Sequence, residues 1–243
     1  MNKRSFLYII GLIFILSFTS ACRSEGVLVD DGLDDNIISI FEEVEPTKDE
    51  VEEEIFAYGP IPDYIVERMM GVSYVENEHI TIEDLAYIQI SHWGFDEKVH
   101  IGELIVNAQV AEEVVEIFRE LFAAKYPIEK MKLIDEYGAD DNLSMMDNNS
   151  SAFCYREVAG SNGKLSKHSY GLAIDINPVQ NPYIKKDIIL PSIGEEYLDR
   201  ENFRTGMIVE GDLCYDAFTS RGWTWGGKWN TLKDYQHFEY NLP

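Results

Sequence analysis

Two side chains that can bind a metal lie seven residues apart in the stretch Ser166–Asn177, which reads SKHSYGLAIDIN. His168 precedes Gly171, and Asp175 follows it inside the alternating apolar run GLAIDI. In a strand, alternation with a period of two places Ala173 and Asp175 on one face and the larger apolar side chains on the other. A charge in such a half-buried strand is costly unless something pairs with it. The sequence therefore raises the question of what pairs with Asp175.

A second group of such side chains lies near the C-terminus, in the stretch DYQHFE. Asp234 precedes His237 by three residues, and Glu239 follows it by two. Zn²⁺ binds imidazole nitrogen and carboxylate oxygen at about 2.0–2.2 Å, and catalytic zinc sites keep three protein ligands and a water. His168, Asp175 and His237 therefore make a candidate ligand set, with Asp234 as a candidate general base. Spacing alone fits equally well a buried polar network in which these side chains satisfy one another.

The elements that must position these residues follow from the hydrophobic pattern. Apolar or alternating runs predict strands at residues 85–95, 102–107 and 172–176. If HFEY is also a strand, His237 and Glu239 share a face. Asn107 is typical of a helix N-cap and an apolar stripe follows it, so we expect a helix that runs to about Tyr126. Helices packed on a small antiparallel sheet make the predicted fold class α+β.

The N-terminal sequence predicts where in the cell the protein is located. Residues 1–22 combine a positive start, an apolar run and the small residues of TSAC, which indicates a signal peptide with a lipobox-like cysteine, Cys22, as the lipidation site. A plain signal peptide or an uncleaved anchor is the alternative. Residues 23–60 hold thirteen acidic and two basic residues, and we expect an acidic disordered linker there. Residues 61–243 are then the folded domain, held outside the bacterial cytoplasm as a membrane-anchored lipoprotein or secreted.

Composition excludes several classes of function. The 243 residues carry a formal net charge of -24, so we expect no nucleic-acid binding, because phosphate recognition needs clusters of Lys and Arg. The three cysteines form no CxxC pair, which excludes a cysteine-rich zinc site. A disulfide between Cys154 and Cys214 is left open by the spacing. We expect a monomer.

Five motifs resemble one family. They are SxHxxGxAxD at Ser166–Asp175, DxxHFE at Asp234–Glu239, INPxxNPY at Ile176–Tyr183, GWTWGG at Gly222–Gly227 and NNSSAFxYR at Asn148–Arg156. In this combination the sequence resembles peptidase family M15, the zinc D-alanyl-D-alanine carboxypeptidases and L-alanyl-D-glutamate peptidases, over about residues 61–243. The GWxWGG run is similar to the branch that contains endolysin-like endopeptidases. The resemblance implies a small α+β domain like that of the hedgehog signalling domain.

The resemblance also implies roles for individual residues. His168, Asp175 and His237 become ligands of one Zn²⁺, Asp234 becomes the catalytic carboxylate, and Glu239 supports a ligand from behind. The implied function is a metallopeptidase that cleaves peptidoglycan stem peptides by attack of a metal-activated water with a carboxylate general base. The alternative is a zinc-containing, non-catalytic cell-wall binding module on the same scaffold.

Three further residues have two interpretations each. Arg156 is a candidate for stabilising charge at the reacting carbonyl or binding a substrate carboxylate, or else it forms an ordinary ion pair. Ser166 either contacts substrate or caps the turn at His168. Asn149 is placed among the substrate contacts, although a polar loop explains it as well. The tryptophans of GWTWGGKW either line a groove or form a core strand with a Gly-Gly bend.

Overall fold

The computed structural model describes residues 54–158 and 160–243. The predicted signal peptide, Cys22 and most of the predicted linker lie outside the described residues. The chain forms four α-helices: α1 (Asp63–Met69), α2 (Ala111–Ala123), α3 (Asp141–Met146) and α4 (Leu213–Thr219). Its strands are β1 (Phe56–Gly59), β2 (Leu85–Trp93), β3 (Val99–Asn107), β4 (Lys130–Met131), β5 (Asn149–Ser150), β6 (Ala173–Asp175), β7 (Tyr183–Lys185), β8 (Ile188–Leu190), β9 (Thr224–Trp225), β10 (Lys233–Asp234) and β11 (His237–Glu239).

The longest strands form an antiparallel sheet in the order β1–β2–β3. Two of them, β2 and β3, are the strands that the sequence predicts at residues 85–95 and 102–107. The edge strand β1 is a correction, because it falls inside the predicted linker and pairs Phe56 with Ile90 and Gly59 with Tyr87. Its residues bond to a neighbour that is distant in sequence, and local composition does not record such a pairing. The folded domain therefore includes Phe56–Gly59, before the predicted start at residue 61.

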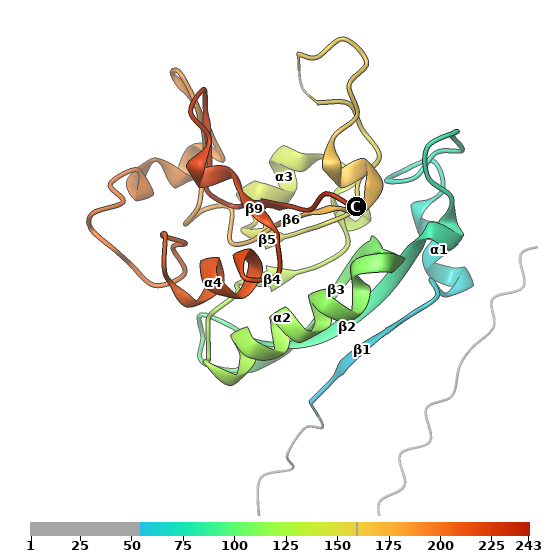
Figure 1. Cartoon of the computed structure of the whole chain (residues 1–243), viewed down its shortest axis with the longest axis horizontal. Coiled ribbons are helices and arrows are strands. Elements are labelled where there is room, and N and C mark those ends of the chain that lie inside the picture. Colours follow the sequence, from blue (N-terminus) through green and yellow to red (C-terminus); the bar gives the residue numbers. More distant parts are fainter. Residues whose placement is uncertain (1–53, 159) are drawn as a thin grey trace, which may run out of the picture. The chain divides into compact units, whose positions relative to one another are not determined.

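Helix α2 lies across one face of this sheet (Figure 1). The side chain of Asn107 accepts a hydrogen bond from the backbone N–H of Gln109 at 3.1 Å, as an N-cap does, and the 3₁₀ turn η2 (Ala108–Val110) precedes the helix. The apolar stripe faces the core, where Val114, Ile117 and Phe118 are buried. The helix ends at Ala123, before the predicted end near Tyr126.

A second antiparallel sheet, β6–β11–β9, carries three of the candidate site residues, Asp175, His237 and Glu239. Helix α4 packs against the core-facing side of this sheet. Its Phe218 stacks on Phe238 of β11, with ring centroids 4.1 Å apart. Phe218 also meets Phe118 of α2, edge to face, at 6.3 Å. These three rings join the second sheet to the helix that covers the first sheet. Burying such aromatic side chains stabilises the arrangement by several kcal/mol in aggregate, at about 1.5–3 kcal/mol each.

The remaining strands form a three-stranded antiparallel sheet, β10–β7–β8, and a parallel pair, β4–β5. Small antiparallel sheets with few helices confirm the predicted α+β class. Cys154 and Cys214 are both buried and form no disulfide, so the pairing left open by the spacing is absent between these two residues.

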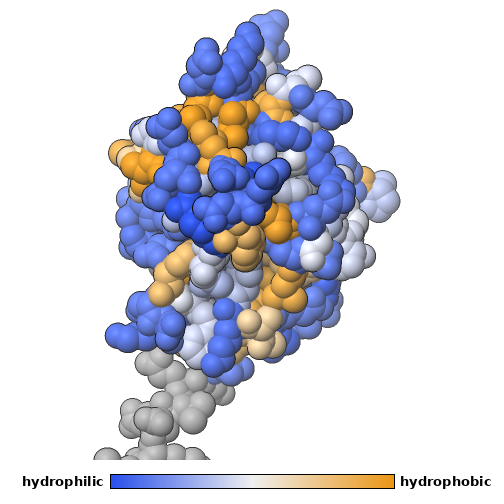
Figure 2. All heavy atoms as spheres, turned by 90° about the vertical axis from the view of Figure 1, so that its left-hand side faces the viewer, coloured by the Kyte–Doolittle hydropathy of each residue, from blue (hydrophilic) through white to orange (hydrophobic). Residues whose placement is uncertain are grey.

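Polar side chains cover most of the surface that Figure 2 shows, and apolar groups lie between them in separate patches. In the described part of the chain, no helix combines the length and the apolar composition needed to cross a bilayer.

The turn that holds His168 is docked on the end of β3. It is the 3₁₀ helix η4 (Lys167–Tyr170), which Gly171 ends in the left-handed conformation at φ 64°. The carbonyl of Gly171 accepts from the backbone N–H of Asn107 at 2.8 Å. A Cβ on Gly171 would lie 2.4 Å from that same backbone nitrogen and 2.7 Å from the carbonyl carbon of Val106. Only glycine fits this close approach of two backbones.

We therefore expect Gly171→Ala to reduce the free energy of unfolding, and Gly138→Ala provides a matched control. Gly138 ends the 3₁₀ helix η3 (Ile134–Tyr137) at nearly the same φ, 63°, but a Cβ there meets nothing within 4 Å. Both changes strain the backbone, and only Gly171→Ala adds the steric clash, which should cost about 1–3 kcal/mol more. Urea denaturation followed by circular dichroism measures the difference. Equal losses for the two variants would contradict this account of the turn.

Candidate metal centre

The short turn before β6 positions His168. Ser166 is the N-cap of η4, and its hydroxyl accepts from the backbone N–H of His168 at 3.3 Å. Gly171 then reverses the chain so that β6 begins at Ala173 and carries Asp175 back toward the turn. The His168 ring is buried. It contacts the carboxylate of Asp175, although the two residues lie at opposite ends of this short stretch.

The register of β6 and β11 positions the other two residues. Asp175 is directly opposite His237, and Ala173 is opposite Glu239. Side chains that are directly opposite on an antiparallel pair share a face, with Cβ atoms about 4.5–5.5 Å apart. His237 therefore faces Asp175, while its neighbour Phe238 points to the core.

The three donor atoms converge. His168 Nε2 lies 3.2 Å from Asp175 Oδ2, and His237 Nδ1 lies 2.9 Å from Asp175 Oδ1. The two ring nitrogens are 3.2 Å apart. All three residues can offer one ligand atom within 4.8 Å of the others. Ligands at about 2.0–2.2 Å around a tetrahedral ion are separated by about 3.3–3.6 Å, so this spacing fits a single ion with a small expansion.

Each histidine has its outer nitrogen engaged, which leaves the inner one free for a metal. His168 Nδ1 bonds to the backbone carbonyl of Ala152, and His237 Nε2 lies 3.4 Å from Glu239 Oε2. A proton on each outer nitrogen makes the inner nitrogen a lone-pair donor. Glu239 thus has the position expected of a residue that orients a ligand from behind.

The electrostatics of the cluster favour an anion between two donors. Burial alone would raise the pKa of Asp175, but the two imidazoles outweigh burial and hold that pKa well below its usual value. Burial also opposes charge on His237, yet hydrogen bonds to Asp175 and Glu239 raise the pKa of His237 to about 10. Both pKa shifts show that a positive charge is stabilised at the point where the three donor atoms meet.

Asp234 lies beside this cluster on β10, opposite Tyr183 of β7. Burial raises the pKa of Asp234 to about 6, and the charge of His237 offsets this only partly. Its Oδ1 atom is buried and has no hydrogen-bond partner among the described residues. A carboxyl group with a pKa near neutrality and a free oxygen is suited to accept and return a proton.

The run of tryptophans and glycines at Gly222–Gly227 packs against the backbone at Asp234 and Tyr235 and holds it in place. A Cβ on Gly226 would lie 2.6 Å from the carbonyl oxygen of Asp234 and 2.8 Å from its Cβ, so the two backbones touch. The indole of Trp225 donates to the carbonyl of Tyr235 at 2.8 Å. Trp223 and Trp225 are buried, which supports a core strand with a Gly-Gly bend for these two. Trp229 is half-buried, and its ring centroid lies 5.4 Å from that of His237.

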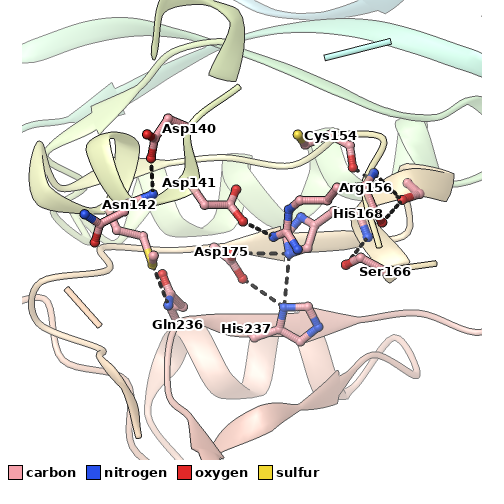
Figure 3. A network of polar contacts seen from close by, with 12 residues as sticks. Asp140, Asp141, Asn142, Cys154, Arg156, Ser166, His168, Asp175, Gln236 and His237 are labelled. Atoms are coloured by element: carbon pink, nitrogen blue, oxygen red, sulfur yellow. Dashed lines mark hydrogen bonds and ion pairs between the residues drawn. The ribbon is translucent and has the colours of Figure 1, made fainter. Parts of the chain in front are cut away.

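Arg156 belongs to the same polar network. Figure 3 draws Arg156 in the network that also contains His168 and Asp175, with its guanidinium toward Asp141. Arg156 Nη2 lies 2.5 Å from Asp141 Oδ2. The ion pair that the sequence offers as one interpretation is therefore formed, and it lies next to the candidate metal centre.

Two predicted substrate contacts have structural roles here. Asn149 is a correction, because it has no exposed surface and its amide is used by the fold: Oδ1 accepts from Lys132 N at 2.8 Å, and Nδ2 donates to the carbonyl of Lys132 at 3.0 Å and to Ser144 Oγ at 3.0 Å. Ser166 is buried, and its hydroxyl caps the turn at His168. A side chain that is enclosed and already bonded has no free surface for a substrate.

Sequence reasoning missed two partners of the site. The carbonyl of Ala152 fixes the His168 ring, and no side-chain pattern could identify a backbone acceptor. Asp141 lies in a polar loop sequence, GADDNLS, in which neither neighbouring aspartate stands out. Only the contact with Arg156 distinguishes Asp141 from Asp140.

Comparison with known proteins gives one match. A family model described as D-alanyl-D-alanine carboxypeptidase matches residues 159–240. The matched segment contains the three candidate ligands and Asp234, and it leaves out the first sheet and α2. Neither the curated proteins nor the solved structures gave a significant match.

Removing a donor from the cluster should remove the metal. We expect wild-type protein purified from metal-supplemented medium to hold about one equivalent of a divalent ion, and His168→Ala and Asp175→Ala to hold far less, because two donors remain of three. His79→Ala is the control, since His79 is half-exposed and lies outside the cluster. Elemental analysis of dialysed protein measures the content. Unchanged metal in both cluster variants would show that the ion binds elsewhere.

Proposed function

We propose that the chain is a zinc-dependent peptidase of family M15 that acts on the stem peptides of peptidoglycan, because the family model described as D-alanyl-D-alanine carboxypeptidase matches residues 159–240. The observation that carries the proposal is the convergence of His168, Asp175 and His237 on one point. Imidazole and carboxylate are ligands that suit Zn²⁺, and three such ligands leave a position for water.

The side chains of the cluster would bind the ion through His168 Nε2, His237 Nδ1 and one oxygen of Asp175. When bound there, Zn²⁺ supplies a water with a pKa near ~7 and polarises the carbonyl that is attacked. The outer hydrogen bonds, from His168 to Ala152 and from His237 to Glu239, hold both rings in the orientation and tautomer needed for this role.

Asp234 would perform the proton transfers. Its raised pKa and its free, buried Oδ1 suit a base that takes a proton from the attacking water and returns it to the leaving amine. Arg156 would offer positive charge to the oxygen of the scissile carbonyl or to a carboxylate of the substrate. Asp234 lies on β10, and the backbone of Arg156 is bonded to the turn that carries His168.

Two peptide bonds are candidates for cleavage. The description of the matching family model favours D-alanyl-D-alanine carboxypeptidase activity, whereas the GWTWGG run resembles the L-alanyl-D-glutamate endopeptidase branch. Mass spectrometry of muropeptides digested with the purified protein distinguishes the two. Loss of one terminal alanine identifies the carboxypeptidase, and release of a peptide that begins with glutamate identifies the endopeptidase.

We also propose an extracytoplasmic location for this domain. The support is the N-terminal sequence, in which a signal-like segment ends at Cys22 and an acidic stretch follows. Lipid attached to Cys22 would retain the domain, which acts as a monomer, at the membrane within reach of the cell wall. Incorporation of labelled palmitate into the wild-type chain, but not into Cys22→Ser, tests this anchor.

A zinc-containing binding module is the second candidate, since the same donor cluster could serve recognition alone. Asp234 favours the enzyme, because a binding module has no use for an unpaired buried carboxyl group with a pKa near neutrality. The two candidates therefore differ in their response to a change at this one residue.

We expect Asp234→Asn to retain the metal and to lose cleavage by about 10²–10⁴-fold, the range typical of a removed general base. The amide has the same shape but cannot take a proton. Release of products from purified muropeptides, followed by chromatography and mass spectrometry, measures the rate. Asp212→Asn is not a suitable control, because Asp212 caps α4, so Asp216→Asn on the exposed side of α4 serves instead. Full activity in Asp234→Asn would remove the proposed base.

A further inference from the structure

The backbone of Arg156 is fixed to the turn that carries His168. Its N–H donates to Ser169 Oγ at 2.9 Å, and its carbonyl accepts from that hydroxyl at 2.7 Å. The same carbonyl accepts from the backbone N–H of Ser166 at 3.0 Å. The backbone of Arg156 is therefore fixed relative to the candidate metal centre. The direction of its long side chain depends on the contacts that the guanidinium makes.

One carboxylate sets that direction. Arg156 Nη2 lies 2.5 Å from Asp141 Oδ2, and about a third of each side chain is exposed, 31% and 35% respectively. Arg156 Nε is buried and has no hydrogen-bond partner among the described residues. The guanidinium is thus held at one end by Asp141, while another of its donors is enclosed at the site and unpaired.

Asp141 lies in the short helix α3, and side-chain hydrogen bonds stabilise both ends of this helix. It is the first residue of α3, and the N-cap residue Asp140 accepts from the backbone N–H groups of Asn142 at 2.9 Å and Leu143 at 3.1 Å. At the other end of α3, Asp147 accepts from Lys130 Nζ at 2.5 Å and from the hydroxyl of Tyr137 at 2.8 Å. The carboxylate of Asp141 therefore comes from an element whose two ends are both bonded.

A second carboxylate lies in the same network. Burial raises the pKa of Asp141, and the nearby carboxylate of Asp175 adds to this rise. An arginine side chain without a partner pairs readily with a nearby carboxylate. Among the described residues Asp141 is the only ion-pair partner of Arg156, so without Asp141 the guanidinium has no carboxylate that fixes its direction.

We propose that Asp141 is a positioning residue, which fixes the direction of the Arg156 guanidinium next to the candidate metal centre. Its consequence for catalysis rests on the proposed peptidase function, whereas its consequence for the orientation of Arg156 does not. Asp140 offers a matched control one residue away, because Asp140→Asn removes the same charge and asparagine is an equally good N-cap.

The experiment combines two readouts on wild type, Asp141→Asn, Asp141→Glu and Asp140→Asn, each with its metal content and circular dichroism spectrum. The first is the ¹⁵N–¹H NMR signal of Arg156 Nε–H, assigned by its absence in Arg156→Lys. We expect a slowly exchanging signal in the wild type and in Asp140→Asn, and its shift or loss in Asp141→Asn. The second is muropeptide cleavage, for which kcat should fall about 10- to 100-fold in Asp141→Asn, with partial recovery in Asp141→Glu.

Each outcome decides the proposal. An unchanged Nε–H signal in Asp141→Asn, or a kcat within twofold of that of Asp140→Asn, overturns the positioning role. If Asp141→Asn fails to fold, Asp141→Ser, which also removes the charge, replaces it, and a signal and a rate identical to those of the wild type overturn the role as well. A wild type that holds metal but cleaves no muropeptide refutes the peptidase function, and the NMR signal then decides alone whether Asp141 orients Arg156.

Discussion

The antiparallel register of β6 and β11 is the constraint on which the candidate site depends. It places Asp175 directly opposite His237 and Phe238 on the opposite, core-facing side. A slip of one residue would turn His237 into the core and Phe238 toward the polar cluster, so the cost of burying a charge and exposing a ring opposes it. Stacking of Phe238 on Phe218 of α4 therefore fixes the candidate metal ligands from the apolar side, without touching them.

The site could be predicted further from the sequence than the architecture could. Chemistry-bearing residue types at motif spacing identified the cluster of His168, Asp175 and His237, which the structure brings together. Strand β2 and the start of α2 after Asn107 follow from alternation and capping, which are local signals. The edge strand β1 could not be found in this way, since its four residues FAYG follow an acidic stretch, show no extended alternation and form a strand through pairing with β2.

The parts of the site that the sequence misassigned or left open share a physical cause. Asn149 looked like a substrate contact because it is polar and lies near a motif, yet its amide holds β5 to β4 through Lys132. Arg156 and Asp141 are fifteen residues apart in the sequence, one outside any helix or strand and the other at the start of α3, so their ion pair depends on how α3 docks. Sequence shows which side chains can form hydrogen bonds, but whether a given group faces solvent or a neighbour is decided by packing.

The two histidines of the cluster differ in how evolution can adjust them. The outer nitrogen of His168 bonds to a main-chain carbonyl, so any residue in place of Ala152 still supplies the same acceptor. The outer nitrogen of His237 bonds to the side chain of Glu239, and a single codon change there alters how basic the ring is. Substitutions at position 152 should therefore leave the basicity of His168 unchanged, whereas substitutions at position 239 should change that of His237. Variation in metal affinity among related chains should be concentrated at the position of Glu239.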